Sequence, residues 1–350
     1  MMAGLWTPLC DLLGIDVPIL CAGMGSVAGA DLVAAISNAG GFGVLGVSGA
    51  SPESVRSRID SARALTSRPI GVNVIIDEDG WAVSAEDREL VRSEVMSAIE
   101  AQVAAVVLFW GDPAPYVELA REGGVKLLVQ VGSLEEAEAA AAAGVDAVIA
   151  QGVEAGGHVR GTTSTWELLP AVVAAVSPLP VLASGGIGDG EGIARAIALG
   201  AQGVSLGTRF VASDESKAHP EYKRRIVESR AKDTVYTEDL YDISWPGAPT
   251  RTLRNRTYDE WETAGHPPPG ERPGEGTIVG TLRMPSGETY DVPRYAGAGS
   301  PLSSFEGDLE YPAMWAGESV EAVNDIKPAG EIVRRLAQDA SAALGAPARS

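Results

Sequence analysis

Short runs of β-branched and other apolar residues recur along the first two-thirds of the chain, and each is followed by a turn and an alanine-rich amphipathic stretch. Because these runs are apolar on both faces and alternate with helical patterns, they are typical of parallel strands covered by helices. We predict strands over Val17–Cys21, Gly43–Leu45, Ile70–Ile75, Ala104–Phe109, Lys126–Gln130, Ala147–Ala150, Val181–Ala183 and Gly203–Leu206.

The stretches between the runs carry signals for the start and the end of helices. The stretch Ser133–Ala142 begins with Ser133 and Glu136 at capping-box spacing and ends before Gly144. Similar patterns predict helices over Asp31–Asn38 and Asp189–Leu199. Eight strands that alternate with helices are the number that a (β/α)8 TIM barrel requires. The pattern therefore predicts such a barrel, while an open doubly wound α/β sheet is an alternative that periodicity does not exclude.

The character of the chain changes in its last third. Residues 231–312 are polar with scattered Trp and Tyr, and the stretch Gly265–Gly276 (GHPPPGERPGEG) is too rich in Pro and Gly for a helix or a central strand. We therefore predict a barrel over residues 1–230 and an irregular appendage or lid over residues 231–312. Residues 313–350 contain an amphipathic helical pattern, Lys327–Leu344, which we expect to pack back on the barrel.

Composition and charge limit the classes of function. With 45% hydrophobic residues among 350, the chain can bury a sizeable core, which excludes general disorder. The formal net charge of −20 argues against a nucleic-acid partner, since phosphate binding needs a basic footprint. No apolar run is long enough for a membrane span and no basic segment precedes the N-terminal apolar stretch, so we predict a cytoplasmic protein. Cys10 and Cys21 are the only cysteines, and with no cluster of ligands at metal-binding spacing we predict no metal.

A glycine-rich turn follows the first predicted strand. Residues Gly23–Ala28 (GMGSVA) match the dinucleotide-binding fingerprint G-x-G-x-x-A of a Rossmann fold. That fingerprint also needs an acidic residue at the end of the second strand, which here ends Val44-Leu45-Gly46 without one. We therefore interpret the turn as a place where a ligand approaches the first strand closely.

Two further glycine turns follow the last two predicted strands. Gly185 and Gly186 follow the seventh strand, and Gly207 and Thr208 follow the eighth. In TIM barrels these two loops and an adjoining helix N-terminus commonly bind a phosphate through backbone N–H groups. Glycine has no Cβ to block the approach of phosphate oxygens. The sequence thus predicts a phosphorylated ligand, and flavin mononucleotide (FMN) suits such a site.

The segment Gln151–His158 (QGVEAGGH) follows the sixth predicted strand. It places one of the three histidines of the chain at the C-terminal face of the barrel, where TIM-barrel enzymes carry their catalytic groups. The near-neutral pKa of histidine suits proton transfer. His219 and His266 lie beside prolines, and we interpret both as structural or solvated. Trp110, at the end of the fourth strand, is a candidate to face the cofactor or the substrate; the alternative, more frequent for a tryptophan at a strand end, is packing in the core.

Together these segments resemble the nitronate monooxygenase family, formerly called 2-nitropropane dioxygenases, which are FMN-dependent (β/α)8 barrels. The family often has Gln-Ala-Pro-Met after the first strand, where this chain has Cys21-Ala-Gly-Met24. The likeness covers roughly residues 15–230 and, more weakly, Trp315–Ile332. It rests on Ala22–Met24, Ala34–Gly43 (AAISNAGGFG), Gly71–Val74 (GVNV), Gln151–His158, Ala183–Gly188, Ser205–Phe210 (SLGTRF) and Ala218–Lys223.

The resemblance implies FMN as cofactor, His158 as the base on the substrate side of the flavin, and small-molecule oxidation with O₂. Its expected reaction converts alkyl nitronates, and nitroalkanes after proton loss, to a carbonyl compound and nitrite. FMN-dependent enoyl-acyl-carrier-protein reductases and some NAD(P)H:quinone reductases share nearly the same motifs and are the alternatives, beside a ligand-binding module without flavin. The residues that would contact FMN are Ala22, Gly23, Met24, Asn73, Gln151, Gly156, Gly185, Gly186, Ser205, Leu206, Gly207 and Thr208.

Overall fold

The computed structural model describes residues 5–77, 80, 83–243, 245–283, 287–297 and 301–345. Eight parallel strands form one sheet in the order β1-β9-β8-β6-β5-β4-β3-β2. A parallel bridge between Leu20 and Phe42 joins the two edges, so the sheet closes on itself. This confirms the predicted TIM barrel. Its strands are β1 (Ile19–Cys21), β2 (Gly43–Gly46), β3 (Ile70–Ile75), β4 (Ala105–Phe109), β5 (Lys126–Val131), β6 (Ala147–Gln151), β8 (Val181–Ser184) and β9 (Gly203–Leu206).

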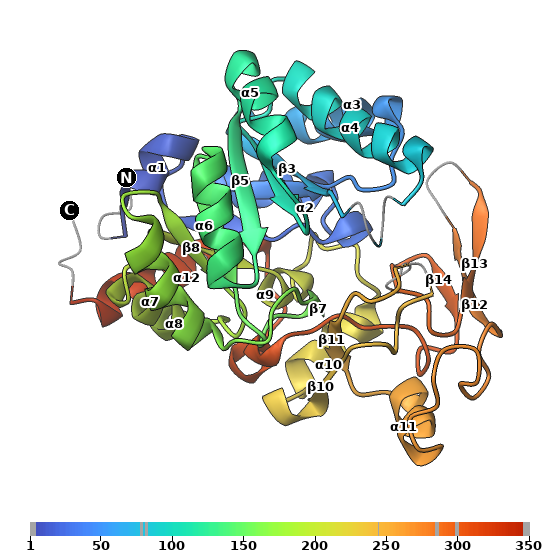
Figure 1. Ribbon diagram of the computed structural model, residues 1–350. Helices are drawn as coiled ribbons and strands as arrows, with labels where there is room; N and C mark the ends of the chain where they lie inside the picture. The colour runs from blue at the N-terminus through green and yellow to red at the C-terminus, as the bar shows by residue number, and fades with distance from the viewer. Residues whose placement is uncertain are drawn as a thin grey trace.

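Helices surround the barrel. Seven of them follow strands in the alternation that the sequence predicts: α2 (Ala30–Asn38), α3 (Pro52–Arg63), α4 (Ala85–Glu100), α5 (Ala114–Gly123), α6 (Leu134–Ala143), α7 (Thr165–Val176) and α8 (Gly190–Ala198). The last strand is followed only by the short α9 (Thr208–Val211), after which the chain leaves the barrel. It returns as α12 (Ala329–Ala343), which packs against both α8 and α2 (Figure 1). The C-terminal helix thus takes the place between the last and the first helix of the ring.

The predicted capping box at the start of α6 is only half formed. The Ser133 hydroxyl accepts from the Glu136 N–H at 3.2 Å, as expected for an N-cap. The Glu136 carboxylate instead accepts from the Gly132 N–H at 2.8 Å, and its other oxygen binds the Arg160 guanidinium at 2.6 Å. Glu136 therefore ties the end of β5 to the loop that follows β6.

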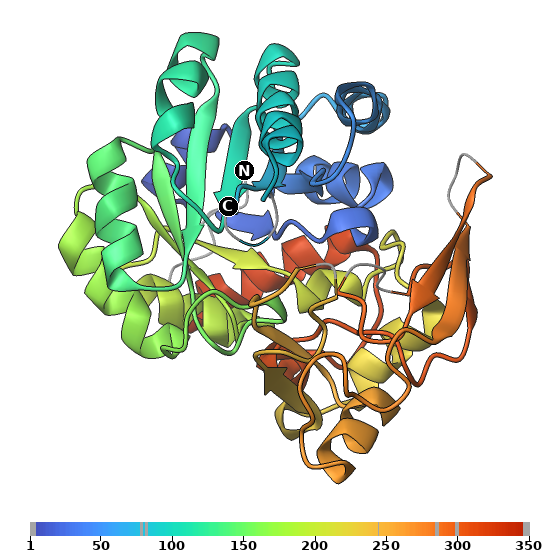
Figure 2. The same cartoon turned by 45° about the vertical axis from the view of Figure 1, so that its right-hand side comes forward.

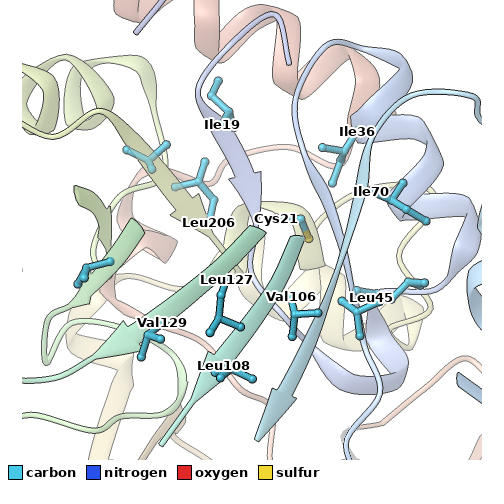
Figure 3. Close-up of a cluster of buried hydrophobic side chains, with 14 of the residues drawn as sticks. Ile19, Cys21, Ile36, Leu45, Ile70, Val106, Leu108, Leu127, Val129 and Leu206 are labelled. Atoms are coloured by element: carbon cyan, nitrogen blue, oxygen red, sulfur yellow. The ribbon is translucent and has the colours of Figure 1, made fainter. Parts of the chain in front are cut away.

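Alternate side chains of each strand serve two different cores. The outward residues pack against the helices, as Figure 3 shows for Cys21, Val106 and Leu108 on the strands and Ile36 on α2. The inward residues, such as Leu20, Val107, Leu128 and Ile149, form a second cluster with α1 (Pro8–Leu13), which contributes Leu9, Cys10 and Leu13. Full burial of each large apolar side chain stabilises the fold by about 1.5–3 kcal/mol. The barrel is therefore packed at its α1 end, and space for a ligand is left at the opposite end.

Residues 231–312, expected to be irregular, contribute strands to two small antiparallel sheets in the part of this segment that the structure describes. One has the order β10-β11-β7, and includes a two-residue strand from the β6–α7 connection. The other has the order β13-β12-β14. The sequence pattern did not predict these strands because their composition is polar. They are stabilised by hydrogen bonds between strands and only partly by burial of apolar side chains. The elements are β7 (Gly157–His158), β10 (Thr234–Thr237), β11 (Thr250–Leu253), α11 (Arg256–Thr263), β12 (Ile278–Arg283), β13 (Thr289–Pro293) and β14 (Phe305–Gly307).

This appendage lies against one side of the barrel, and the hairpin β12–β13 stands at its edge (Figures 1 and 2). The Pro/Gly-rich stretch 265–276 forms turns and bends. The domain boundaries at residues 230 and 312 stay predictions. Across the described part of the chain, no helix has both the length and the apolar composition that a membrane crossing requires.

Candidate functional site

A cavity of about 690 Å³ lies at the C-terminal ends of the barrel strands. Its volume is in the range of small-molecule and cofactor sites. Inward residues of the strands, among them Leu20, Val107 and Ile149, line it. His158 and every residue predicted to contact the cofactor also line it, so the fold brings together Ala22, Gly23, Met24, Asn73, Gln151, Gly156, Gly185, Gly186, Ser205, Leu206, Gly207 and Thr208.

The two predicted phosphate loops lie in this cavity wall. Gly185 and Gly186 have φ angles of 103° and 69°, a left-handed conformation that residues with a Cβ rarely adopt. The Thr165 hydroxyl donates to the Gly185 carbonyl at 3.0 Å and holds that turn against α7. Gly207 is the N-cap of α9, and the Thr208 hydroxyl accepts from the Gly317 N–H at 3.0 Å. Both turns are thus held in place by contacts from distant parts of the chain.

A buried guanidinium supports the α9 loop from behind. Arg209 is 5% exposed and donates to the Asp325 carboxylate at 2.9 Å and to the Ala212 carbonyl at 2.8 Å. Asp325 also binds Arg335 of α12 at 3.1 Å. The last turn of the barrel is therefore tied to the helix that closes the ring.

Gly23 and Asn73 occupy adjoining space at the end of β1. The Asn73 side-chain amide donates to the Val107 carbonyl at 3.0 Å. A Cβ on Gly23 would lie 2.3 Å from Asn73 Oδ1, which is closer than atoms can approach. Glycine at position 23, where the family often has proline, is therefore required by the place of the Asn73 side chain. The residues that follow form a short 3₁₀ helix, η1 (Gly25–Val27). In a Rossmann fold they would form the first turn of an α-helix.

Gln151 holds the segment that carries the histidine. Its side-chain amide donates to the His158 carbonyl at 3.0 Å, and its Oε1 accepts from the Arg160 N–H at 3.0 Å. Both polar ends of Gln151 are thus used by the loop. We interpret Gln151 as a residue that positions His158, in addition to its place in the cavity wall.

Two further residues hold the same loop, and sequence reasoning missed both. The Glu154 carboxylate accepts from the Thr165 N–H at 2.8 Å at the start of α7. Arg251 of β11 donates to the Val153 carbonyl at 3.0 Å and binds Glu318 at 3.2 Å. These contacts, with the pairing of His158 opposite Thr250, fix the histidine between the barrel and the appendage.

The imidazole of His158 lies between two indoles. Its ring centroid is 4.3 Å from that of Trp245 and 5.3 Å from that of Trp315. Nε2 is enclosed and has no hydrogen-bond partner among the described residues. Burial lowers the pKa of His158 from 6.5 to about 4, so the imidazole is neutral at neutral pH. An enclosed nitrogen without a partner is costly, and it is a group that a bound ligand could engage.

Trp245 and Trp315 line the cavity, whereas Trp110 does not. Trp110 is 6% exposed, and its ring lies 4.9 Å from that of Trp245 and beneath the Arg160 guanidinium. The Trp245 indole N–H donates to Asp77 at 2.6 Å. Trp245 lies among the scattered tryptophans of the polar segment 231–312, and Trp315 begins the weaker stretch of likeness Trp315–Ile332, but neither signal indicated a place beside His158.

The loop after β2 forms another part of the wall through Ser48. The Arg58 guanidinium donates to the Gly46 carbonyl at 3.0 Å, and the Glu94 carboxylate of α4 accepts from the Ala50 N–H at 2.8 Å. Glu94 is fully buried, and its second oxygen has no hydrogen-bond partner among the described residues. Burial raises the pKa of Glu94 from 4.5 to about 7. A carboxyl group that titrates near neutrality thus supports a cavity loop.

The donor set of the cavity suits a planar ring system with a phosphate. Glycine turns and the hydroxyls of Ser184, Ser205 and Thr208 gather at one wall, and apolar strand residues form another. Among the described residues that line the cavity, none is Asp, Glu, Lys or Arg. A phosphate here would depend on backbone N–H groups and hydroxyls, as at glycine-rich loops before helices. The residues present therefore fit FMN.

Comparison with known proteins identifies close relatives. A nitronate monooxygenase from Paraburkholderia phytofirmans is 32% identical over 95% of this chain and 94% of its own length. A (3aS,4S,5R,7aS)-5-hydroxy-7a-methyl-1-oxo-octahydro-1H-indene-4-carboxyl-CoA dehydrogenase from Mycobacterium tuberculosis is 38% identical over 73% of this chain and 68% of its own length.

Solved structures give the same fold. FabK from Thermotoga maritima superposes with a TM-score of 0.79 at 34% identity, covering 97% of each chain. The nitroalkane oxidase from Streptomyces ansochromogenes superposes with a TM-score of 0.77 at 30% identity, covering 96% of this chain and 99% of its own. The family model for nitronate monooxygenase matches residues 7–339. The chain is therefore an oxidoreductase that belongs to the nitronate monooxygenase family.

Proposed function

We propose that this protein binds FMN and oxidises alkyl nitronates with O₂ to a carbonyl compound and nitrite. The observation that carries the proposal is the position of the His158 imidazole in the cavity wall, where its Nε2 has no hydrogen-bond partner among the described residues. A neutral imidazole can accept the α-proton of a nitroalkane, the step that turns it into a nitronate. The similarity to nitronate monooxygenases and to a nitroalkane oxidase supports this reaction.

Each part of the wall has a proposed task. The turns at Gly185–Gly186 and Gly207–Thr208 would hold the phosphate of FMN, and the apolar strand ends would contact its ring system. FMN, when bound, would supply the electron transfer to O₂. His158 would take the proton from a neutral nitroalkane, and Trp245 and Trp315 would exclude water from the reacting atoms.

A direct experiment tests the proposal. Purified protein should be yellow, and alkyl nitronates should give nitrite and consume O₂. Mixing with NADH or NADPH without air should leave the flavin oxidised. A protein that rebinds no FMN, or one that forms no nitrite from any nitronate, would contradict the proposal.

An FMN-dependent reductase that uses NAD(P)H, the alternative that shares the sequence motifs, is the second candidate. FabK of T. maritima is compatible with it and is as similar to this chain in structure as the nitroalkane oxidase is. One feature argues against it. The formal net charge of −20 disfavours the docking of an acidic acyl carrier protein. Rapid anaerobic reduction of the flavin by NADH or NADPH would favour the reductase.

A further inference from the structure

The cavity that His158 lines is also lined by apolar residues in another region. We call this region the outer arm. It lies between the barrel mouth and the appendage, and its walls come from segments that are far apart in the sequence. The residues that define the outer arm are Val27, Val211, Tyr222, Leu282, Tyr290 and Leu302.

The wall of the outer arm is continuous and apolar. Val27, Val211 and Tyr222 belong to one buried cluster, and Leu282 belongs to a separate cluster within the β12–β13–β14 sheet. Leu302 packs against both clusters and so joins the barrel side to the hairpin side. The two halves of the arm therefore form one surface.

The described residues that define the outer arm offer no charge to a ligand, and the Tyr290 hydroxyl donates to the Glu288 carboxylate at 3.0 Å. None of the defining residues is ionised at neutral pH. The Tyr222 hydroxyl donates a hydrogen bond to the Trp315 carbonyl at 2.5 Å. Burial raises the pKa of Tyr222, so this hydroxyl stays protonated. A ligand group placed here gains free energy only by removing apolar surface from water.

We propose that the outer arm binds the apolar chain of the substrate, whose reacting end lies against His158. The inference rests on the proposed function and specifies its substrate class as nitronates that carry a medium or long alkyl chain without a second charge. Tyr290 of the β12–β13 hairpin lines the arm and is 53% exposed, so the arm opens to solvent at that residue. Figures 1 and 2 show this hairpin at one edge of the appendage.

The first test measures binding without turnover. Straight-chain carboxylates have a planar anionic end like that of a nitronate but do not react, and their binding to the FMN-loaded protein can be followed by the flavin absorbance. Each buried methylene should tighten binding by about two- to fourfold, so decanoate should bind at least about fiftyfold more tightly than butanoate. Equal affinities for butanoate and decanoate would overturn the proposal.

Two matched variants locate the chain. Leu302 and Leu309 are both partly buried and pack against the same two clusters, but only Leu302 lines the cavity. Leu302→Gln should weaken decanoate binding about tenfold or more and leave butanoate binding and FMN content near wild type. Leu309→Gln should leave both affinities unchanged. Equal loss of decanoate binding in the two variants, or equal loss for both ligands in Leu302→Gln, would overturn the proposal.

A kinetic series separates this inference from the proposed function. Values of kcat/KM for the nitronates of nitrobutane to nitrodecane should rise with chain length and flatten in Leu302→Gln. If no nitronate gives nitrite while the carboxylate series keeps its chain-length dependence, the proposed reaction fails and the apolar arm stands. If nitronates react but neither series depends on chain length, the outer arm fails and the reaction stands.

Discussion

The imidazole of His158 stacks on the indole of Trp245, with ring centroids 4.3 Å apart and planes inclined by 38°. The two residues come from different parts of the fold, since His158 lies in the β6–α7 connection and Trp245 in the appendage. Their contact helps to exclude water from the imidazole and so favours its neutral form. The appendage therefore contributes to the chemistry of the barrel residue.

Replacing His158 separates proton transfer from binding. His158→Asn should lower kcat/KM for a neutral nitroalkane by about 10²–10⁴-fold, the usual effect of a positioned acid–base group. Activity on the matching nitronate should fall much less, because that substrate arrives without its α-proton. The measurement compares nitrite formation from both forms, with FMN content as control. Equal losses on both substrates would assign His158 to binding.

The pH profile reports the burial of His158. Because the pKa of His158 is lowered to about 4, kcat/KM for a neutral nitroalkane should stay high well below pH 6.5 and fall only towards pH 4. Trp245→Ala should admit water and move the acid limb upward towards 6.5, whereas Trp245→Phe should move it less. A wild-type acid limb at or above pH 6.5 would contradict this account.

The same lowered pKa affects folding. Between pH 6.5 and about 4 the unfolded chain binds a proton at His158 that the folded chain does not. The free energy of unfolding therefore decreases as the pH falls through that range. His158→Asn should remove it. Thermal unfolding at pH 7 and pH 5 should show a smaller loss of Tm on acidification in the variant than in the wild type.

Glu94 gives the opposite pH dependence. Its pKa is raised to about 7, so its folded form binds more protons between pH 4.5 and 7 and its contribution to stability falls as the pH rises through that range. Glu94→Gln should shrink the difference in unfolding free energy between pH 5 and pH 8 by about 1–3 kcal/mol. Denaturant titrations at both pH values measure it. An unchanged difference would show that Glu94 does not titrate there.

Arg209 should control how tightly FMN is held. Arg209→Lys loses part of the fork that binds Asp325 and the Ala212 carbonyl, and the α9 loop should become looser. We expect FMN to bind about tenfold more weakly. This change corresponds to part of the roughly 1.5–3 kcal/mol that a hydrogen bond to a charged group typically contributes. Equilibrium dialysis measures this affinity. Arg335→Lys is the control, since that side chain is 59% exposed and binds Asp325 from outside.

Local pattern was enough to predict the barrel and the glycine turns that form part of the cavity wall. Parallel strands buried on both faces need continuous apolar runs, and the glycine turns at Gly185–Gly186 and Gly207 need residues without a Cβ near a ligand. Each of these requirements is met by neighbouring residues, so it is visible in the sequence. The predicted strands lie in the barrel in their expected order, and their C-terminal turns meet at one cavity.

The sequence by itself determined the barrel, its glycine turns and the place of His158 after the sixth strand. Only the tertiary structure decided that Trp245 and Trp315 enclose His158. It also decided that the Gln151 side chain hydrogen-bonds the loop through both its amide nitrogen and its oxygen, and that α12 completes the ring of helices. It also placed Trp110 behind the cavity wall against Trp245. The physical reason is that contacts between distant segments depend on how whole elements pack, and no periodicity along the chain records which side chains will meet.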